Sequence, residues 1–218
     1  MDVLGGEGQV QRVRLDDETL DTFNRHRIHK CSSLDAAWTE LDDLLEKGRR
    51  VLFVSNQVDN AQQRFRTVRE RYPDVPAMLI HSRYKRQDRA ELEDKIEVFE
   101  QQEGPCVVCA TQVVEVSLDM SFDAMITDAA PLDGMIQRFG RVNRQRSEET
   151  IGRLKPIYVI APPEDDAAIL PYDAETVRSS FKALPADGEV LREANVQDRI
   201  DDVYPEVEIP EVDTHFIW

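Results

Sequence analysis

Three arginines stand at spacings of three in the second half of the chain, and their side chains could bind a polyphosphate. Arg138, Arg141 and Arg144 follow Gln137 and flank Gly140. On a helix they would form one steep cationic ridge, with Gln137 and Arg141 as neighbours one turn apart. A guanidinium is always charged, and its planar fork of donors matches phosphate oxygens. The alternative is a solvated helix face, which is the usual fate of a run of charge.

The segments before the arginines favour a binding site over a solvated face. Residues 106–110 and 124–128 are short apolar runs typical of buried strands. Pro131 then interrupts the chain before a helix expected near 133–143. In open α/β sheets, ligands bind where loops gather at the carboxyl ends of parallel strands. We therefore expect the arginine helix to lie at a ligand-binding edge.

Strands and helices alternate along the rest of this region. An amphipathic helix is expected at 34–47, between Ser33 as its cap and Gly48 as its stop. Such alternation predicts a parallel sheet with right-handed crossovers. The other expected elements are an edge strand at 9–15, strands at 51–55, 77–80 and 156–160, a helix at 58–71 that exposes many arginines and glutamates, and a helix at 86–101.

Two long motifs resemble a known family. The runs ATQVVEVSLD at 110–119 and QRFGRVNR at 137–144 resemble motifs V and VI of superfamily-two helicases, most closely the CRISPR-associated helicase-nuclease of type I systems. VLFVSN at 51–56 and HSRY at 81–84 resemble further sequence motifs of the same lobe. The resemblance covers about residues 50–160, and it departs from many relatives at Ser117 and Asn143, where they have glycine.

The alternation of strands and helices and the resemblance together predict an α/β fold. We expect a RecA-like helicase C-terminal lobe with a parallel sheet over residues 31–162. A polar lead-in at 1–30 would precede it, and an acidic, mostly helical extension at 163–218 would follow. Helices are expected in that extension at 173–184 and near 188–203.

The resemblance implies a nucleotide site shared between two lobes, with ATP and Mg²⁺ in the cleft. Arg141 and Arg144 would reach the β- and γ-phosphates, one of them as an arginine finger. Gln137 would lie near the γ-phosphate or the attacking water, and an acid at the end of motif V would bond the ribose. The nucleotide-binding residues that it implies beside these three are Asp119, Arg138 and Gly140.

The resemblance also implies a face for single-stranded DNA. Thr111 follows a strand, where a hydroxyl and a backbone N–H can hold a phosphate. Serine and asparagine after a strand are also ordinary turn residues, which is the alternative for part of the set. The whole set is Ser55, Asn56, His81, Ser82, Arg83, Arg89, Thr111 and Gln112.

The sequence lacks the motifs that would hold Mg-ATP. It contains no Gly-Lys pair, hence no G-x-x-x-x-G-K-[ST] loop, and no Asp-Glu-x-His or His-Asp pair. We expect it to be inactive alone and to need a partner P-loop helicase lobe. With that lobe, single-stranded DNA and a CRISPR effector complex, it would take part in ATP-driven unwinding in antiviral defence. The alternatives are a non-catalytic DNA-binding or effector-docking fragment left from a disrupted helicase gene, and a superfamily-two lobe that acts on RNA.

Cysteine usage and hydropathy predict a cytoplasmic protein with no membrane partner. Three cysteines cannot form a complete disulfide framework, and no apolar run approaches the ~20 residues that span a bilayer. Cys106 and Cys109 have zinc-like spacing, and His26, His29 and Cys31 could add ligands. A step of three on a strand, however, puts Cys106 and Cys109 on opposite faces, so we expect no metal site.

The charge pattern predicts adaptation to molar salt. The net charge is −16, yet the segments at 81–90 and 137–146 are basic, and lysine is scarce beside arginine. Self-repulsion of excess acid is screened within about 3 Å at 1 M ionic strength. We therefore expect the melting temperature, followed by circular dichroism, to rise between low and molar salt. An unchanged melting temperature would indicate an ordinary acidic protein.

Overall fold

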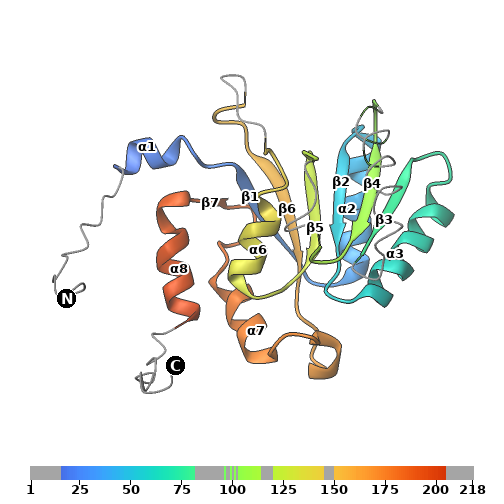
Figure 1. Cartoon of the computed structure of the whole chain (residues 1–218). Helices are drawn as coiled ribbons and strands as arrows, with labels where there is room; N and C mark the ends of the chain where they lie inside the picture. The colour runs from blue at the N-terminus through green and yellow to red at the C-terminus, as the bar shows by residue number, and fades with distance from the viewer. Residues whose placement is uncertain are drawn as a thin grey trace, which may run out of the picture.

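The computed structural model describes residues 16–81, 96, 99, 101, 103–113, 120–144 and 150–204. These residues contain a seven-stranded sheet at the centre of the protein (Figure 1). The strands are β1 (His26–Cys31), β2 (Arg50–Val54), β3 (Ala77–Ile80), β4 (Cys106–Ala110), β5 (Ala124–Asp128), β6 (Lys155–Ile160) and β7 (Val190–Leu191).

The sheet is almost entirely parallel. Its strands lie in the order β3-β4-β2-β5-β6-β1-β7, and only β7 runs antiparallel to its neighbour β1. The expected α/β fold with a parallel sheet is confirmed. Residues 9–15 and most of 86–101, where a strand and a helix were expected, lie outside the described residues.

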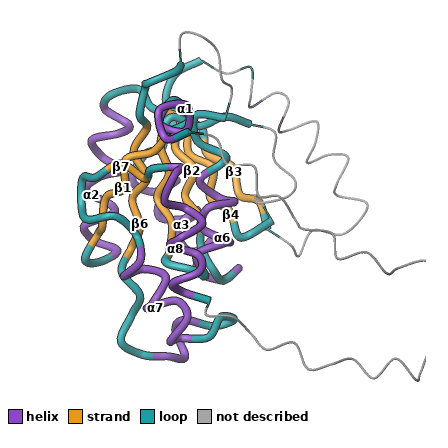
Figure 2. Tube along the Cα trace, turned by 90° about the vertical axis from the view of Figure 1, so that its left-hand side faces the viewer, coloured by secondary structure: helices purple, strands orange, loops and turns teal. Residues whose placement is uncertain are grey.

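Helices cover both faces of the sheet. Val51 and Phe53 of β2 pack with α2 and α3, whereas Leu52 and Val54 face α6 and α7, as expected from the two-residue period of a strand. Figure 2 shows α2 on the side of the sheet away from α6 and α8. The helices are α1 (Asp17–Asp21), α2 (Leu34–Glu46), α3 (Val58–Arg71), α6 (Leu132–Phe139), α7 (Ala174–Ala183) and α8 (Val196–Val203), with 3₁₀ turns η1 (Asp166–Ile169) and η2 (Glu193–Asn195).

The sheet extends beyond the expected lobe at both ends. β1 pairs with β6 along its whole length, so the expected boundary at residue 31 cuts through a strand. β7, inside the expected extension, pairs with His26 and Arg27. β1 was missed because HRIHKC contains few apolar residues, although His26, Ile28 and Cys31 are buried. The helix expected near 188–203 is likewise β7, η2 and the shorter α8.

The cysteines are free and buried. Cys106 belongs to the apolar cluster on the α6 side of the sheet and Cys109 to the cluster on the α2 side. The expectation that they lie on opposite faces is confirmed. Among the described ranges, no group of three or more metal-ligating side chains could hold an ion. No helix in the same ranges has the length and apolar character to cross a bilayer.

Candidate nucleotide and nucleic-acid interfaces

The carboxyl ends of the strands meet at one edge of the sheet, where part of the expected site lies. The amide of Ser55 donates to the carbonyl of Ala110 at 2.8 Å, and that of Thr111 donates to Ile80 at 3.1 Å. Ser55, His81 and Thr111 therefore follow neighbouring strands β2, β3 and β4. This edge is called the carboxyl edge below.

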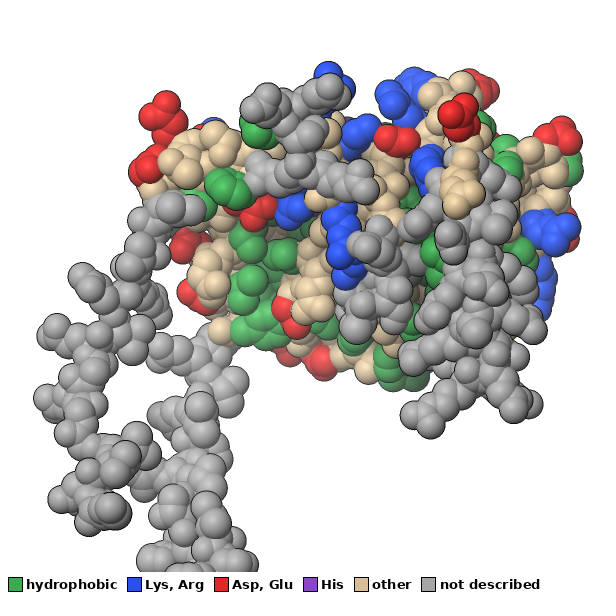
Figure 3. All heavy atoms as spheres, turned by 45° about the horizontal axis from the view of Figure 1, so that its top comes forward, with side chains coloured by type: hydrophobic (Ala, Val, Ile, Leu, Met, Phe, Trp, Pro, Cys, Tyr) green, Lys and Arg blue, Asp and Glu red, His purple; other side chains and the backbone are tan. Residues whose placement is uncertain are grey.

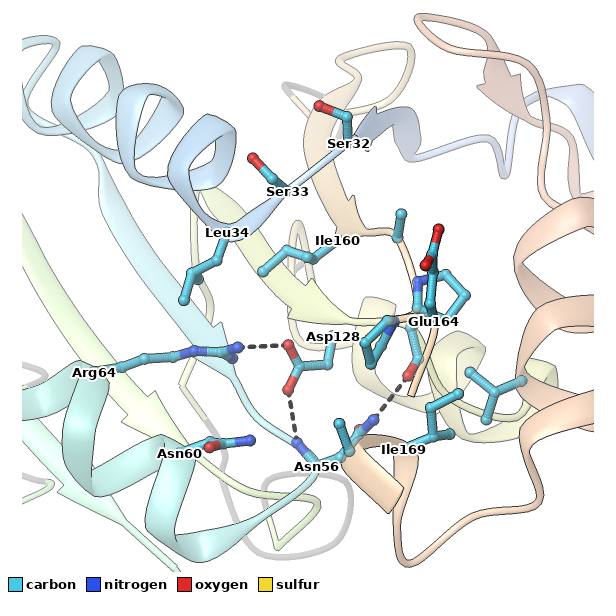
Figure 4. A pocket seen from close by; sticks show the side chains of 16 residues that line it. Ser32, Ser33, Leu34, Asn56, Asn60, Arg64, Asp128, Ile160, Glu164 and Ile169 are labelled. Atoms are coloured by element: carbon cyan, nitrogen blue, oxygen red, sulfur yellow. Dashed lines mark hydrogen bonds and ion pairs between the residues drawn. The ribbon is translucent and has the colours of Figure 1, made fainter. Parts of the chain in front are cut away.

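An ion pair between a buried arginine and a partly buried aspartate lies at the carboxyl edge. Nη2 of Arg64, on α3, is 2.6 Å from Oδ1 of Asp128, which ends β5 (Figure 4). Nη1 of Arg64 donates to Oγ of Ser55 at 2.7 Å, and its guanidinium lies 4.7 Å from the centre of the Phe53 ring. The helix at 58–71 was expected to expose its arginines, but Arg64 is 7% exposed. Its place between the buried Ala61 and Val68, at helical spacing, could have indicated this.

Asn56 joins this ion pair to the arginine helix. Its backbone N–H donates to Oδ2 of Asp128 at 3.1 Å, and its Nδ2 donates to the carbonyl of Ala129 at 2.7 Å (Figure 4). Its Oδ1 accepts a hydrogen bond from Nη1 of Arg138 at 3.0 Å. Ser55 and Asn56 are both buried, so the expectation that their side chains face DNA does not fit this arrangement. They hold the edge together instead.

Arg138 does not belong to an exposed cationic ridge. Its side chain is fully buried and donates to Oγ1 of Thr127 at 3.2 Å and to the Tyr172 hydroxyl at 3.2 Å, in addition to Asn56. It lies on the buried face of α6 with Met135, three residues earlier. The expected contact between Arg138 and a nucleotide is therefore wrong for this arrangement. Its spacing from Met135 was the available signal.

A cavity of about 500 Å³ opens beside this network. Arg64, Asp128 and Asn56 form its polar side, while Leu34 and Ile160 belong to its apolar side (Figure 4). Neither His81 nor Thr111 lines it. The cavity is thus a neighbour of the expected DNA-binding face along the carboxyl edge.

The polar residues after β3 and β4 have hydrogen-bonding capacity to offer. The hydroxyl oxygen of Thr111 and Oε1 of Gln112 are buried and have no hydrogen-bond partner among the described residues. His81 Nε2 lies 3.5 Å from Nε2 of Gln62. The expected site residues Ser82, Arg83, Arg89 and Asp119 lie outside the described residues.

The arginine helix ends earlier than expected, which moves two arginines onto a loop. α6 stops at Phe139, Gly140 caps it, and Arg141 and Arg144 lie beyond it. A Cβ on Gly140 would lie 3.2 Å from the carbonyl oxygen of Gln137, so a side chain there would be crowded. The prediction that the three arginines form one ridge on a helix is therefore wrong. Gln137 and Arg144 are exposed, and Arg141 is half-buried.

Residues 140–144, the arginine loop, are braced by backbone contacts. The amide of Phe122 donates to Arg141 at 3.1 Å, and the amide of Asn143 donates to Phe122 at 3.2 Å. The amide of Arg144 donates to Oγ of Ser121 at 3.3 Å. Asn143 has a φ of 54°, a left-handed conformation that asparagine tolerates, and its Nδ2 donates to the Arg153 carbonyl at 2.8 Å.

The arginine loop lies at the amino ends of the strands, opposite the carboxyl edge. Phe122, its partner, directly precedes β5. The expectation that the arginines share an edge with the strand-end loops is wrong, because α6 carries the chain across the sheet. Lys and Arg side chains are spread over this amino edge (Figure 3). Basic residues that begin strands there include Arg50 and Lys155.

Asp123 joins two of these strand starts. Its Oδ1 lies 2.7 Å from Nζ of Lys155, and its Oδ2 accepts from the Arg50 amide at 3.1 Å. Burial alone would raise the pKa of Asp123, but the Lys155 ammonium and the Arg50 amide outweigh burial and lower the pKa. The ionised carboxylate of Asp123 therefore links the starts of β2 and β6 at the amino edge.

His26 was set aside in the sequence as a weak metal ligand, yet it contacts the arginine loop. It is 3% exposed, and its Nε2 lies 3.0 Å from the carbonyl oxygen of Val142. Burial lowers the pKa of His26 to about 4. The imidazole is therefore neutral at neutral pH, so one ring nitrogen can donate and the other cannot.

The sheet, the strand-end polar residues and the arginine loop define a RecA-like lobe of a superfamily-two helicase. Residues 47–147 match the family model of the CRISPR-associated nuclease/helicase Cas3, C-terminal. The match and the relatives below support a C-terminal RecA-like lobe of this family over those residues.

Individual relatives agree with this assignment. A Cas3 of Methanocaldococcus jannaschii, described as a putative CRISPR-associated nuclease/helicase, is 30% identical over 193 residues, which are 80% of this chain and 26% of the relative. The T. fusca Cas3-ADP crystal structure has a TM-score of 0.71 at 22% identity over 83% of this chain and 24% of its own. A chain of a CRISPR RNA-guided surveillance complex, pre-nicking, has a TM-score of 0.69 at 24% identity over 86% of this chain and 26% of its own. The chain thus spans about a quarter of the length of these relatives.

The Arg64–Asp128 pair gives a stability prediction. Asp128→Asn leaves a buried guanidinium without its counter-charge, so we expect the free energy of unfolding in urea to fall by about 3–5 kcal/mol. The control is Asp166→Asn, in a pair with Arg178 at the same 2.6 Å but with Asp166 72% exposed. That variant should change the free energy of unfolding by less than about 1 kcal/mol. Equal effects of the two changes would contradict a special role for the buried pair.

His26 gives a pH prediction. Its pKa is lowered from 6.5 to about 4 in the folded protein. Between these values the unfolded chain binds a proton that the folded chain refuses, so stability falls as pH drops through this window. We expect the stability advantage of the wild type over His26→Asn to shrink between pH 7 and 4 by on the order of 3 kcal/mol. Parallel curves from urea titrations at a series of pH values would refute a neutral buried His26.

Proposed function

We propose that this chain is the second motor lobe of a CRISPR-associated superfamily-two helicase. It would contribute an arginine finger and single-stranded DNA contacts to ATP-driven unwinding of target DNA in antiviral defence. The observation that carries the proposal is the braced arginine loop, which follows the helix of the exposed Gln137 and bears the exposed Arg144 at an edge where Lys and Arg side chains are found.

The amino edge fits the phosphates of ATP. Gln137, Arg141 and Arg144 would approach the β- and γ-phosphates, and Mg²⁺ would be held by the P-loop lobe, whose motifs this sequence lacks. ATP supplies the phosphoanhydride bond whose cleavage releases free energy. The arginines would stabilise the negative charge that develops on the transferred phosphoryl group, and one such finger is worth about 10³–10⁵ in rate in related enzymes. A nucleotide in the T. fusca relative supports this reading.

The carboxyl edge fits the backbone of single-stranded DNA. The hydroxyl of Thr111 has no hydrogen-bond partner among the described residues and could donate to a phosphate oxygen, Gln112 follows it, and His81 lies after the neighbouring strand β3. Ser82, Arg83 and Arg89 would add donors and positive charge from the segment that follows. Asp119 would bond the ribose of the nucleotide. DNA and nucleotide would thus bind at opposite edges, with α6 between them.

Two partners follow from this proposal. The first is a P-loop helicase lobe, which would supply the phosphate-binding and Mg²⁺-binding motifs that this sequence lacks. The second is a CRISPR effector complex, supported by the structural likeness to a chain of a surveillance complex. Closure and opening of the two lobes around ATP would then move the protein along one DNA strand.

Arg144→Ala tests the finger. The chain would be combined with a separately expressed P-loop helicase lobe, and DNA-stimulated ATP hydrolysis and single-stranded DNA affinity would be measured. We expect kcat to fall by about 10³-fold or more while DNA affinity changes little. Arg153→Ala is the control, because it removes the same charge from an exposed residue near the same loop.

Three results would overturn parts of the proposal. Equal loss of ATP hydrolysis and DNA binding in Arg144→Ala would remove the finger assignment. DNA binding without hydrolysis in the presence of any P-loop lobe would identify the chain as a non-catalytic DNA-binding or effector-docking module. A preference for RNA over DNA would place it among RNA helicases.

A further inference from the structure

His26 lies where it can fix the arginine loop from outside the motif. It comes from β1, 116 residues before Val142, and its Nε2 is 3.0 Å from the Val142 carbonyl oxygen. Its ring also meets the ring of Phe139 edge to face, with centroids 6.1 Å apart. Phe139 ends α6 and Val142 follows the turn at Gly140, so one side chain contacts both sides of that turn.

The ionisation of His26 fits a donor role. Burial and the charge of Arg25 lower its pKa, so the ring is neutral at neutral pH. Since a carbonyl oxygen only accepts, the proton of the neutral ring must sit on Nε2 for this contact to be a hydrogen bond. A neutral donor also adds no positive charge beside Arg141 and Arg144. The ring thus supplies a directional contact without electrostatic repulsion.

The Val142 carbonyl depends on this contact. The backbone bonds of the Phe122–Val142 bridge use the Arg141 carbonyl and the Asn143 amide, so they leave the Val142 carbonyl oxygen out. Val142 itself is fully buried. A buried carbonyl without a donor is unfavourable, and the loop would shift to find one. Because Arg141 and Arg144 flank Val142 and Asn143, such a shift would move their guanidinium groups.

We infer that His26 is a positioning residue for the arginines of the nucleotide site. This inference rests on the proposed function, because the arginines matter only if they meet a nucleotide. β1 is itself fixed between β6 and β7. Through His26, the position of Val142 therefore depends on the sheet as well as on α6. His26 thus adds to the contacts that Ser121, Phe122 and the Arg153 carbonyl make with the arginine loop.

Two variants separate the donor from the ring. His26→Phe keeps an aromatic ring against Phe139 but cannot donate, whereas His26→Gln replaces the ring and keeps an N–H at similar reach. Cys31→Ala is the matched control, because it removes buried volume from the other end of β1 without touching the loop. Cys31→Ala therefore shows how far a loss of stability in β1 alone changes the measured exchange and activity.

The first measurement is amide hydrogen exchange on the full chain alone. The amides of Asn143 and Arg144, which bond to Phe122 and Ser121, should exchange at least about tenfold faster in His26→Phe, and His26→Gln should restore most of their protection. The amides of α2 serve as the reference. Unchanged exchange in His26→Phe, or an equal change in Cys31→Ala, overturns the inference.

The second measurement uses the chain with its P-loop lobe. His26→Phe should lower kcat for ATP hydrolysis by about tenfold to hundredfold, with a smaller change in KM and partial recovery in His26→Gln. Faster exchange with an unchanged kcat overturns the positioning role. A wild-type pair without ATP hydrolysis would instead overturn the proposed function, and the exchange result would still decide whether His26 holds the loop.

Discussion

The burial of two guanidinium groups at one sheet edge is the constraint on which the structure depends. Arg64 is paired with the Asp128 carboxylate, and Arg138 donates to oxygens of Asn56, Thr127 and Tyr172. Removing charged groups from water is costly unless their donors are satisfied. The chain therefore has few ways to arrange α3 and α6 against the ends of β2 and β5.

That constraint reaches the opposite edge through α6. Eight residues of helix rise about 12 Å, enough to carry the chain from one end of the strands toward the other. Arg138 fixes the rotation of this helix, and the helix ends where the arginine loop begins. The expected nucleotide contacts at Gln137, Arg141 and Arg144 lie on or just after this helix, whereas the expected DNA contacts follow β3 and β4 at the other edge of the sheet.

Sequence reasoning was reliable where apolar residues are consecutive or regularly spaced. β2, β4 and α2 follow from such patterns, and the parallel sheet follows from their alternation. It failed where tertiary contacts reverse the usual preference of a residue. Arg64 and Arg138 are charged and buried, β1 is polar yet pairs with β6 along its whole length, and α6 stops at Phe139 with no proline to end it. Those outcomes depend on partners distant in the chain, which local patterns do not contain.

The two residues of β7 have a consequence for solubility. An uncovered edge strand presents a row of free backbone groups on which another chain can add a strand, which is a route to aggregation. β1 would be such an edge, yet its amides at Ile28 and Lys30 donate to the Glu189 carbonyl and the Asp187 carboxylate, and its Ile28 carbonyl accepts from Gly188. The segment from 187 to 191 therefore shields β1 well beyond its own two-residue strand, and it does so with a carboxylate that self-association would have to displace.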